Sequence, residues 1–201
     1  MKKSFDTALD IYLNCENFIR SISTQKTVCI DLKVNAIMYQ SAPRMVIMVD
    51  SKIIYNDYLC EGENSILLNA DLLSENSSIK IGMREKTSQD TLVNDEGQIL
   101  ADNAIEIIWL RLDGIDIIQD YDFFRTHITY FLHDTEDYVA PLKGFWQNGD
   151  LAIEFQSPLI LWYNERSTKN TGVDDTMKYR NILSTKTLMQ DFFDSLQKLR
   201  I

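Results

Sequence analysis

The sequence predicts a mainly β fold, an antiparallel β-sandwich of jelly-roll type with a helical segment at each end. Nine or ten short apolar runs follow one another at intervals of 8–12 residues, as the strands of a sandwich do. Turn signals such as Asp113-Gly114 and Asn148-Gly149 separate these runs. The strand–helix–strand alternation of a parallel sheet is missing. We therefore expect a sandwich domain over residues 24–163, preceded by a helical segment (1–23) and followed by a strap and helix (164–201).

The first expected element is an amphipathic helix over residues 4–22. Its apolar residues recur with the three- and four-residue spacing of one helix face. They are Phe5, Ala8, Tyr12, Cys15, Ile19 and Ile22. Ser4 stands where an N-cap residue is expected. Ile11 and Leu13 lie off this face, so a strand around Ile11–Leu13 is the alternative.

From residue 27 the apolar period changes to two, which is typical of a strand with one buried face. The expected strands of the first half are residues 28–34, Met45–Val49, Lys52–Tyr58, Ser65–Ala70, residues 79–83 and Ile105–Leu112. Asp50-Ser51 is a tight turn between two of them. Asp113-Gly114 predicts a hairpin that returns the chain into Ile115–Ile118. Residues 84–97 are polar and end in a turn.

The second half continues the strand pattern and then becomes polar. The expected strands are His127–Leu132, Gly144–Trp146, Leu151–Phe155 and Leu159–Tyr163. The turn at 147–150 predicts a hairpin between the second and third of these strands. Residues 164–186 are irregular and carry a net charge of +2, so they form either a solvated loop or an arm that docks on an acidic neighbour.

The chain ends in a predicted amphipathic helix, which begins with a capping box at Thr187 and Gln190. Its apolar face supplies the candidate partner-binding residues Leu188, Met189, Phe192, Phe193, Leu196 and Leu199. Such a face must be covered, because it is too apolar to leave in water. It docks either on its own sandwich or on another chain, and the strap before it is long enough for both.

The charge of the chain excludes several classes of partner. Asp and Glu outnumber Lys and Arg by 30 to 20, which gives a net charge of −10. A sequence-independent grip on nucleic acid needs basic side chains against the phosphates, so no nucleic acid is expected. No apolar run is long enough to insert into a membrane, and no signal peptide precedes the first element. Synthesis in a cytoplasm is the expectation.

Neither a metal site nor a catalytic site has a recognisable motif. Cys15, Cys29 and Cys60 are isolated and are expected to be small buried residues. His127 and His133 lie near an acidic run, but no further Cys or His stands at zinc-ligand spacing. Glycine-rich phosphate loops and nucleophile motifs are missing too. We expect no catalytic centre, no metal and no cofactor, with a calcium loop or a glycosidase carboxylate pair as the less favoured alternatives.

Aromatic residues near turns are the candidate ligand-binding groups. Sugars stack their apolar faces on aromatic rings, while planar polar side chains bind their hydroxyls. The candidate residues are Trp146, Gln147, Asn148 and Tyr163. Trp109 stands in the middle of an apolar strand and is expected in the core. For Trp146, Trp162 and Tyr163, burial in the core is the favoured interpretation, and exposure at a ligand site is the alternative.

Three segments of the first half are Met48–Lys52, the run I-K-I-G-M-R-E-K-T-S-Q-D-T at 79–91, and Leu112–Ile115. Together they resemble jelly-roll carbohydrate-binding modules and their relatives in tailed bacteriophages. The second half contains G-F-W-Q-N-G at 144–149 and F-Q-S-P-L-I-L-W at 155–162. This pattern resembles small virion-associated proteins of contractile-tailed bacteriophages. The resemblance implies a jelly roll that builds or binds rather than catalyses.

The resemblance leads to two functional hypotheses. The first is a non-enzymatic structural component of a phage tail, baseplate or capsid periphery, located in the virion after synthesis in the host cytoplasm. Its partners would be other virion proteins or copies of itself. The alternative is a glycan-binding module that recognises a host surface sugar through Trp146 and its neighbours. An enzyme acting on polysaccharides is the third and least favoured class.

Overall fold

The computed structural model describes residues 26–167, which form thirteen strands, two α-helices and one 3-10 helix. The elements are β1 (Thr27–Ile37), β2 (Arg44–Val49), β3 (Lys52–Tyr58), β4 (Gly62–Asp71), β5 (Asn76–Arg84), η1 (Ser88–Asp90), β6 (Thr91–Val93), β7 (Ile99–Asp102), β8 (Ala104–Leu112), β9 (Ile115–Asp116), α2 (Tyr121–His127), β10 (Ile128–Leu132), β11 (Asp137–Val139), β12 (Gly144–Phe145), β13 (Gly149–Gln156) and α3 (Leu159–Ser167). None of the helices in these residues has the length and hydropathy that crossing a membrane requires.

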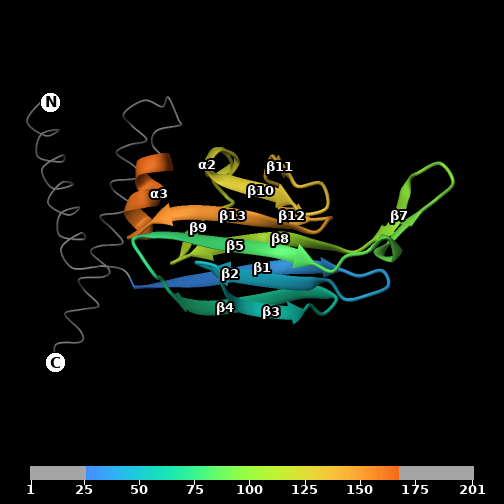
Figure 1. The fold of residues 1–201 in the computed structure, drawn as a ribbon, viewed down its shortest axis with the longest axis horizontal. Helices are drawn as coiled ribbons and strands as arrows, with labels where there is room; N and C mark the ends of the chain where they lie inside the picture. Colours follow the sequence, from blue (N-terminus) through green and yellow to red (C-terminus); the bar gives the residue numbers. More distant parts are fainter. Residues whose placement is uncertain (1–25, 168–201) are drawn as a thin grey trace, which may run out of the picture. The chain divides into compact units, whose positions relative to one another are not determined.

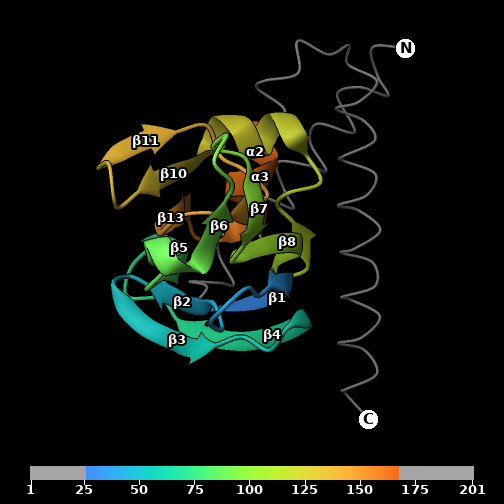
Figure 2. The same cartoon turned by 90° about the vertical axis from the view of Figure 1, so that its right-hand side faces the viewer.

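Two antiparallel sheets form the body of the fold, and their inner faces enclose the core (Figures 1 and 2). The smaller sheet has the strand order β12-β8-β1-β4, with β9 paired to β8. The larger sheet has the order β11-β10-β13-β5-β2-β3. Both belong to one compact unit that ends at Trp162. The expected antiparallel, mainly β architecture is confirmed.

The core follows from the period-two pattern of the strands. In β1 the side chains of Val28, Ile30 and Leu32 are fully buried, whereas the residues between them are partly exposed. In β5 Ile79 and Ile81 are fully buried in the same way. Alternation of this kind places one face of each sheet toward the other sheet and one face toward solvent.

Two of the predicted turns, Asp50-Ser51 and Asp113-Gly114, adopt left-handed backbone conformations. Asp50 and Ser51 have φ values of 48° and 67°, and they join β2 to β3. Asp113 and Gly114 have φ values of 49° and 81°, and they join β8 to β9. Two successive left-handed residues match the twist of the flanking strands. The two hairpins are therefore confirmed.

Asp50 also connects its hairpin to the start of β5. One carboxylate oxygen accepts a hydrogen bond from the backbone N–H of Ser78 (2.8 Å). The other accepts from the N–H of Leu73 (2.9 Å) and the hydroxyl of Ser77 (3.0 Å). A single carboxylate thus satisfies three donors of the connection between β4 and β5.

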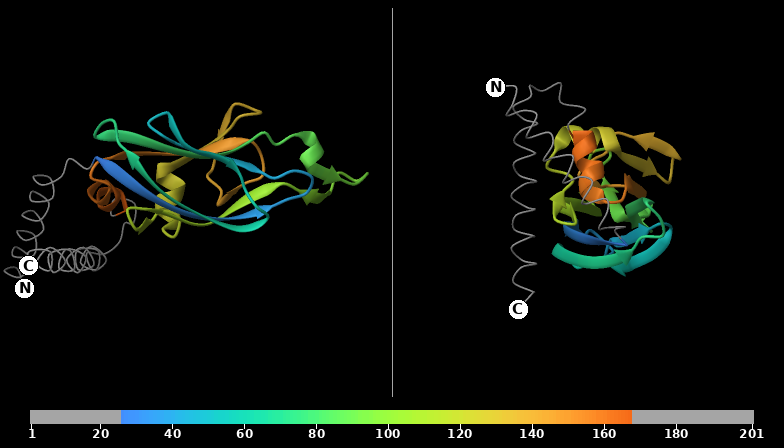
Figure 3. Two further views of the ribbon diagram at one scale, coloured as in Figure 1. Left: turned by 90° about the horizontal axis from the view of Figure 1, so that it is seen from below. Right: turned by 90° about the vertical axis from the view of Figure 1, so that its left-hand side faces the viewer.

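The polar segment 84–97 leaves the sandwich and returns through a small hairpin of β6 and β7, which projects beyond the ends of the sheet strands (Figures 1 and 3). Asp90 anchors its base and is only 4% exposed. One of its oxygens accepts from the Ser41 hydroxyl (2.6 Å) and the Asn103 amide (2.9 Å). The other accepts from the N–H (2.8 Å) and hydroxyl (2.9 Å) of Thr87.

The hydrogen bond from Ser41 is the largest cause that lowers the pKa of the Asp90 carboxyl below its ordinary value of 3.8, and those from Thr87 lower it further. Burial opposes this shift. The hydrogen bonds favour the charged form of the carboxyl more than burial disfavours it. The segment returns to the sandwich at the buried residue Asn103, whose side-chain amide oxygen accepts a hydrogen bond from Tyr39 N–H.

The expected strand Leu159–Tyr163 is wrong, because the chain forms helix α3 there. The carbonyl of Pro158 accepts hydrogen bonds from the N–H groups of Leu161 and Trp162, which closes the first turn. Proline favours a helix start, since its fixed φ suits the first turn and its missing N–H is not needed. The Trp162 ring then packs edge-on against Phe123, with the ring centroids 5.3 Å apart.

The expected strand His127–Leu132 begins one residue late, at Ile128. His127 ends helix α2, whose N-cap Asp120 accepts a hydrogen bond from Phe123 N–H (3.0 Å). This short helix buries Phe123 and Phe124 completely, so tertiary packing decides the conformation here.

The hairpin expected between Gly144–Trp146 and Leu151–Phe155 is also wrong. β12 pairs with β8 in the smaller sheet, whereas β13 pairs with β5 and β10 in the larger one. The Asn148 amide bonds the backbone N–H (2.9 Å) and carbonyl (2.8 Å) of Lys86 at the end of β5. The turn therefore carries the chain from one sheet to the other instead of folding it back.

Two groups of expectations lie outside the described residues. They are the N-terminal helix of residues 4–22, and the strap from residue 168 with the helix that carries Leu188 to Leu199. The domain bounds of 24–163 stay a prediction.

Replacing Asp50 by alanine should lower the free energy of unfolding by about 2–4 kcal/mol, because three hydrogen bonds are lost and alanine resists a positive φ. Asp50→Gly is the matched control, since glycine loses the hydrogen bonds but tolerates the conformation; its loss should be smaller by about 1 kcal/mol. Urea unfolding measures both values. Equal, small losses below about 0.5 kcal/mol in both variants would contradict the structure.

The Asp90 network should give stability a specific pH dependence. Its folded pKa is lowered, so its contribution is complete above the unfolded pKa of about 4 and is lost as the pH falls through the folded value. Asp90→Asn should cost about 2 kcal/mol at pH 7. The gap to the unmodified protein should narrow as the pH falls below about 4. Unfolding curves measured across this range test the sign, and a constant gap would refute it.

Candidate functional site

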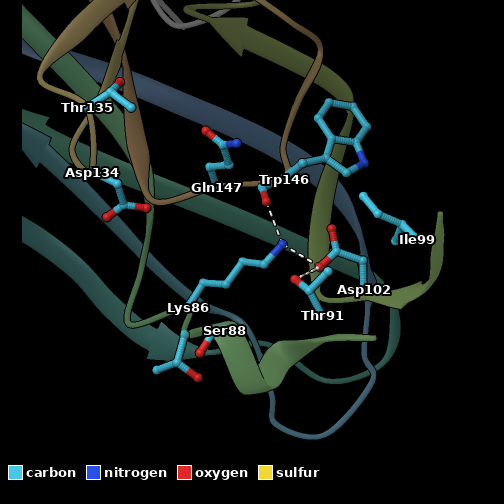
Figure 4. Close-up of a pocket in the computed structure, with 10 residues that line it drawn as sticks. Lys86, Ser88, Thr91, Ile99, Asp102, Asp134, Thr135, Trp146 and Gln147 are labelled. Atoms are coloured by element: carbon cyan, nitrogen blue, oxygen red, sulfur yellow. Dashed lines mark hydrogen bonds and ion pairs between the residues drawn. The ribbon is translucent and has the colours of Figure 1, made fainter. Parts of the chain in front are cut away.

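A cavity of about 490 Å³ lies where three connections meet at one end of the sandwich (Figure 4). They are the segment from Lys86 to Asp102, the turn between β10 and β11, and the crossing from β12 to β13. Its lining residues are Lys86, Thr87, Ser88, Thr91, Ile99, Asp102, Asp134, Thr135, Trp146 and Gln147. A volume of this size is typical of small-molecule sites in proteins, which measure roughly 300–1,000 Å³.

An ion pair forms the base of the cavity. The Lys86 ammonium lies 2.5 Å from a carboxylate oxygen of Asp102 and also donates to the backbone carbonyl of Trp146. The same Asp102 oxygen accepts the hydroxyl of Thr91 (2.6 Å). Both charged side chains are largely buried. The pair therefore neutralises its own charge and holds the Trp146 backbone against the 86–102 segment (Figure 4).

Trp146 provides an apolar surface at the rim of the cavity. It is 40% exposed, and Figure 4 shows its indole on the same side as Ile99. Gly144 makes room for the ring, because a Cβ at that position would stand 2.9 Å from the indole Cη2. The indole is thus supported from behind by backbone while part of its surface stays in solvent.

Uncommitted polar side chains surround this aromatic. Gln147 neighbours it in sequence, and Asp134 and Thr135 lie on the opposite side of the cavity (Figure 4). All three are exposed, and within residues 26–167 no hydrogen bond involves the side chains of these three residues. An amide, a carboxylate and a hydroxyl are therefore available to a ligand with its own hydroxyl groups.

The four sequence candidates have different places in this structure. Trp146 and Gln147 both line the cavity. Asn148 holds the turn through its two bonds to the Lys86 backbone, so a ligand contact by its amide stays a prediction. Tyr163 lies on α3 and belongs to a separate compact unit, so its role is also still a prediction.

The expectation that Trp109 lies in the core is wrong. A register shift between Lys33 and Val34 changes the parity of β8, which leaves Leu110 buried and turns Trp109 to the outer face of the smaller sheet. There the Lys33 ammonium and the Arg111 guanidinium both contact the ring, and each lies 4.9 Å from its centroid. Two cation–π contacts occupy this ring.

The histidines do not come together as ligands. His133 contacts the Asp150 carboxylate at 2.8 Å, whereas His127 lies against the ring of Phe123. In the part of the chain that the structure describes, no group of three His, Cys, Asp or Glu residues is arranged to hold a metal ion.

Sequence reasoning missed Lys86, Ile99, Asp102 and Thr135 as site residues. Lys86, Ile99 and Asp102 lie 44 or more positions before Trp146, and Thr135 lies in a separate hairpin. Only the long-range pairing of strands brings these residues to one place. The acidic run that begins at Asp134 was visible in the sequence, but nothing local connects it with Trp146.

Comparison with known proteins gives a weak structural likeness. No family model matches the chain, and no curated protein matches it. Among solved structures, the selenomethionine form of the calcium-dependent carbohydrate-binding module vCBM60 has a TM-score of 0.43 and 6% identity over 63% of this chain and 89% of that one. The same module in complex with galactobiose has a TM-score of 0.40 and 7% identity over 62% of this chain and 96% of that one. Likeness at this level leaves the ligand of this chain to its own residues.

Proposed function

We propose that the protein is a non-catalytic module that binds a glycan in the cavity beside Trp146. The observation that carries the proposal is a supported, partly exposed indole at a cavity whose polar side chains are uncommitted. The C–H faces of a sugar ring stack on an aromatic surface, while amide and carboxylate groups bind its hydroxyls. Gln147, Asp134 and Thr135 supply those polar groups.

The charges at the cavity favour a neutral sugar. Lys86 and Asp102 cancel one another, so the remaining charge of the lining is the carboxylate of Asp134. A carboxylate accepts hydrogen bonds from sugar hydroxyls but repels an acidic sugar, and the chain as a whole carries −10. Neutral oligosaccharides are therefore the proposed ligand class.

The groups at the base of the cavity suit a structural role better than catalysis. Asp102 is paired with Lys86 and accepts the Thr91 hydroxyl, and the same lysine donates to the Trp146 carbonyl. These groups hold the wall of the cavity together, so they are engaged with one another and not with a ligand. This arrangement supports binding without turnover.

The role in a phage virion stays a prediction, as does the jelly-roll topology that the resemblance implies. Its candidate partner-binding residues, Leu188 to Leu199, lie outside the described residues. The two hypotheses are compatible, because a glycan-binding module could attach a particle to a host surface sugar.

Replacing Trp146 by alanine should weaken binding of a neutral oligosaccharide about tenfold or more, because the stacking surface is lost. Gln147→Ala should weaken it severalfold through the loss of amide hydrogen bonds. Tyr121→Ala is the matched control, since Tyr121 is an exposed aromatic on α2 away from the cavity lining. Calorimetric titration after screening a panel of neutral and acidic glycans measures these affinities. A protein that binds no glycan of the panel, or whose Trp146→Ala variant binds equally well, would overturn the proposal.

A further inference from the structure

A second hollow, of about 350 Å³, lies on the solvent face of the larger sheet and is lined by residues of β5, β10, β11 and β13 together with His127. The strand register explains why the face is hollow there. Ala152 stands between Thr129 and Lys80 in one cross-strand row, and Gly82 stands next to Asp150 in the following row. The small side chain of Ala152 leaves a depression between larger neighbours, whereas the space over Gly82 is taken by the Asp150 carboxylate.

The base of this hollow is fixed by a charged network. The Asp150 carboxylate reaches over Gly82, where a Cβ would meet it at 2.1 Å. Arg84 donates to one of its oxygens (2.6 Å), and His133 contacts the other (2.8 Å). Asp150 is therefore buried and already bonded, so it shapes the hollow and is not its polar contact.

An aromatic wall stands along one side. Phe131 and Tyr138 are opposite one another in the pairing of β10 with β11, and their ring centroids are 5.0 Å apart. Tyr138 is 75% exposed, which is unusual for so large an aromatic side chain. Its ring is available as a flat apolar surface beside the hollow.

Uncommitted polar groups accompany the aromatic wall, as they do at the first cavity. Lys80 and Glu154 both line the hollow, and neither side chain has a hydrogen-bond or ion-pair partner within residues 26–167. One is a donor and the other an acceptor, and their charges are opposite. Such a pair can donate to and accept from hydroxyl groups without attracting a polyanion.

We propose that this hollow is a second glycan-binding site, which takes a neutral sugar unit. The ligand class of this second site rests on the proposed function, but the residues that line it are different from those of the first cavity. The β10–β11 hairpin links the two sites: its turn residues Asp134 and Thr135 line the first, and its strand residues Phe131 and Tyr138 line the second. A polysaccharide engages both sites at once, which raises its affinity over that of a short oligosaccharide.

The test compares Tyr138→Ala, Trp146→Ala and the double variant with Tyr121→Ala as the control. Each protein is titrated with a short neutral oligosaccharide by calorimetry, and its binding to the insoluble neutral polysaccharide of the same sugar is measured by depletion. The unmodified protein should bind two oligosaccharides, each single variant one, and the double variant none. Either single substitution should weaken polysaccharide binding about tenfold or more.

Glu154→Gln provides a second variant in case Tyr138→Ala disturbs the hairpin. Glu154 is exposed and should not affect folding, and its loss should weaken the second site severalfold while the first site is unchanged. A single site that only Trp146→Ala removes would overturn the second site and leave the proposed function standing. A single site that only Tyr138→Ala and Glu154→Gln weaken would overturn the proposed function and leave the second site standing. Preference for an acidic polysaccharide would overturn the neutral ligand class.

Discussion

The crossing of the chain between the sheets at Trp146–Asn148 is the constraint on which the candidate site depends. β12 ends in one sheet and β13 begins in the other, so the connection cannot close as a hairpin. Lys86 holds this connection in place by two interactions. The Asn148 side-chain amide bonds the Lys86 backbone, and the Lys86 ammonium donates to the Trp146 carbonyl. With the backbone fixed at both points, the Trp146 indole is directed to the rim of a cavity and not into the core.

The sequence was most informative where a local signal decides the conformation. Alternation of apolar residues predicted β1 and β5, and the two-residue turns at Asp50 and Asp113 predicted the β2–β3 and β8–β9 hairpins. It failed where distant contacts decide. The run after Pro158 is too short for its period to distinguish a helix from a strand, and a register shift opposite Lys33 moved Trp109 from the inner to the outer face.

The candidate site was predictable only in part, for the same reason. Trp146 and Gln147 could be chosen because a turn residue is normally exposed. Lys86 and Asp102 could not, because an ion pair between distant positions forms only after the 86–102 segment has folded onto β12. Asn148 shows the opposite case: its residue type suggested a ligand contact, but its amide serves the backbone of a strand end. A polar residue at a turn can therefore serve the fold through its own hydrogen bonds to the backbone.

The two hollows have the same arrangement of polar groups. The buried charges at the base are paired with one another, whereas the exposed polar side chains that we propose for the ligand have no partner among the described residues. Lys86 with Asp102 in one, and Arg84 with Asp150 in the other, shape the base and cancel their own charge. Burying either charge alone would be costly, so these pairs cannot be exchanged for a ligand ion without loss of stability. The binding free energy must then come from aromatic surface and from hydrogen bonds at the rim, which are the contributions that a neutral, hydroxyl-rich ligand can use. The overall charge of an acidic chain disfavours polyanions, and the local chemistry of the two hollows fits the neutral-sugar class that we propose.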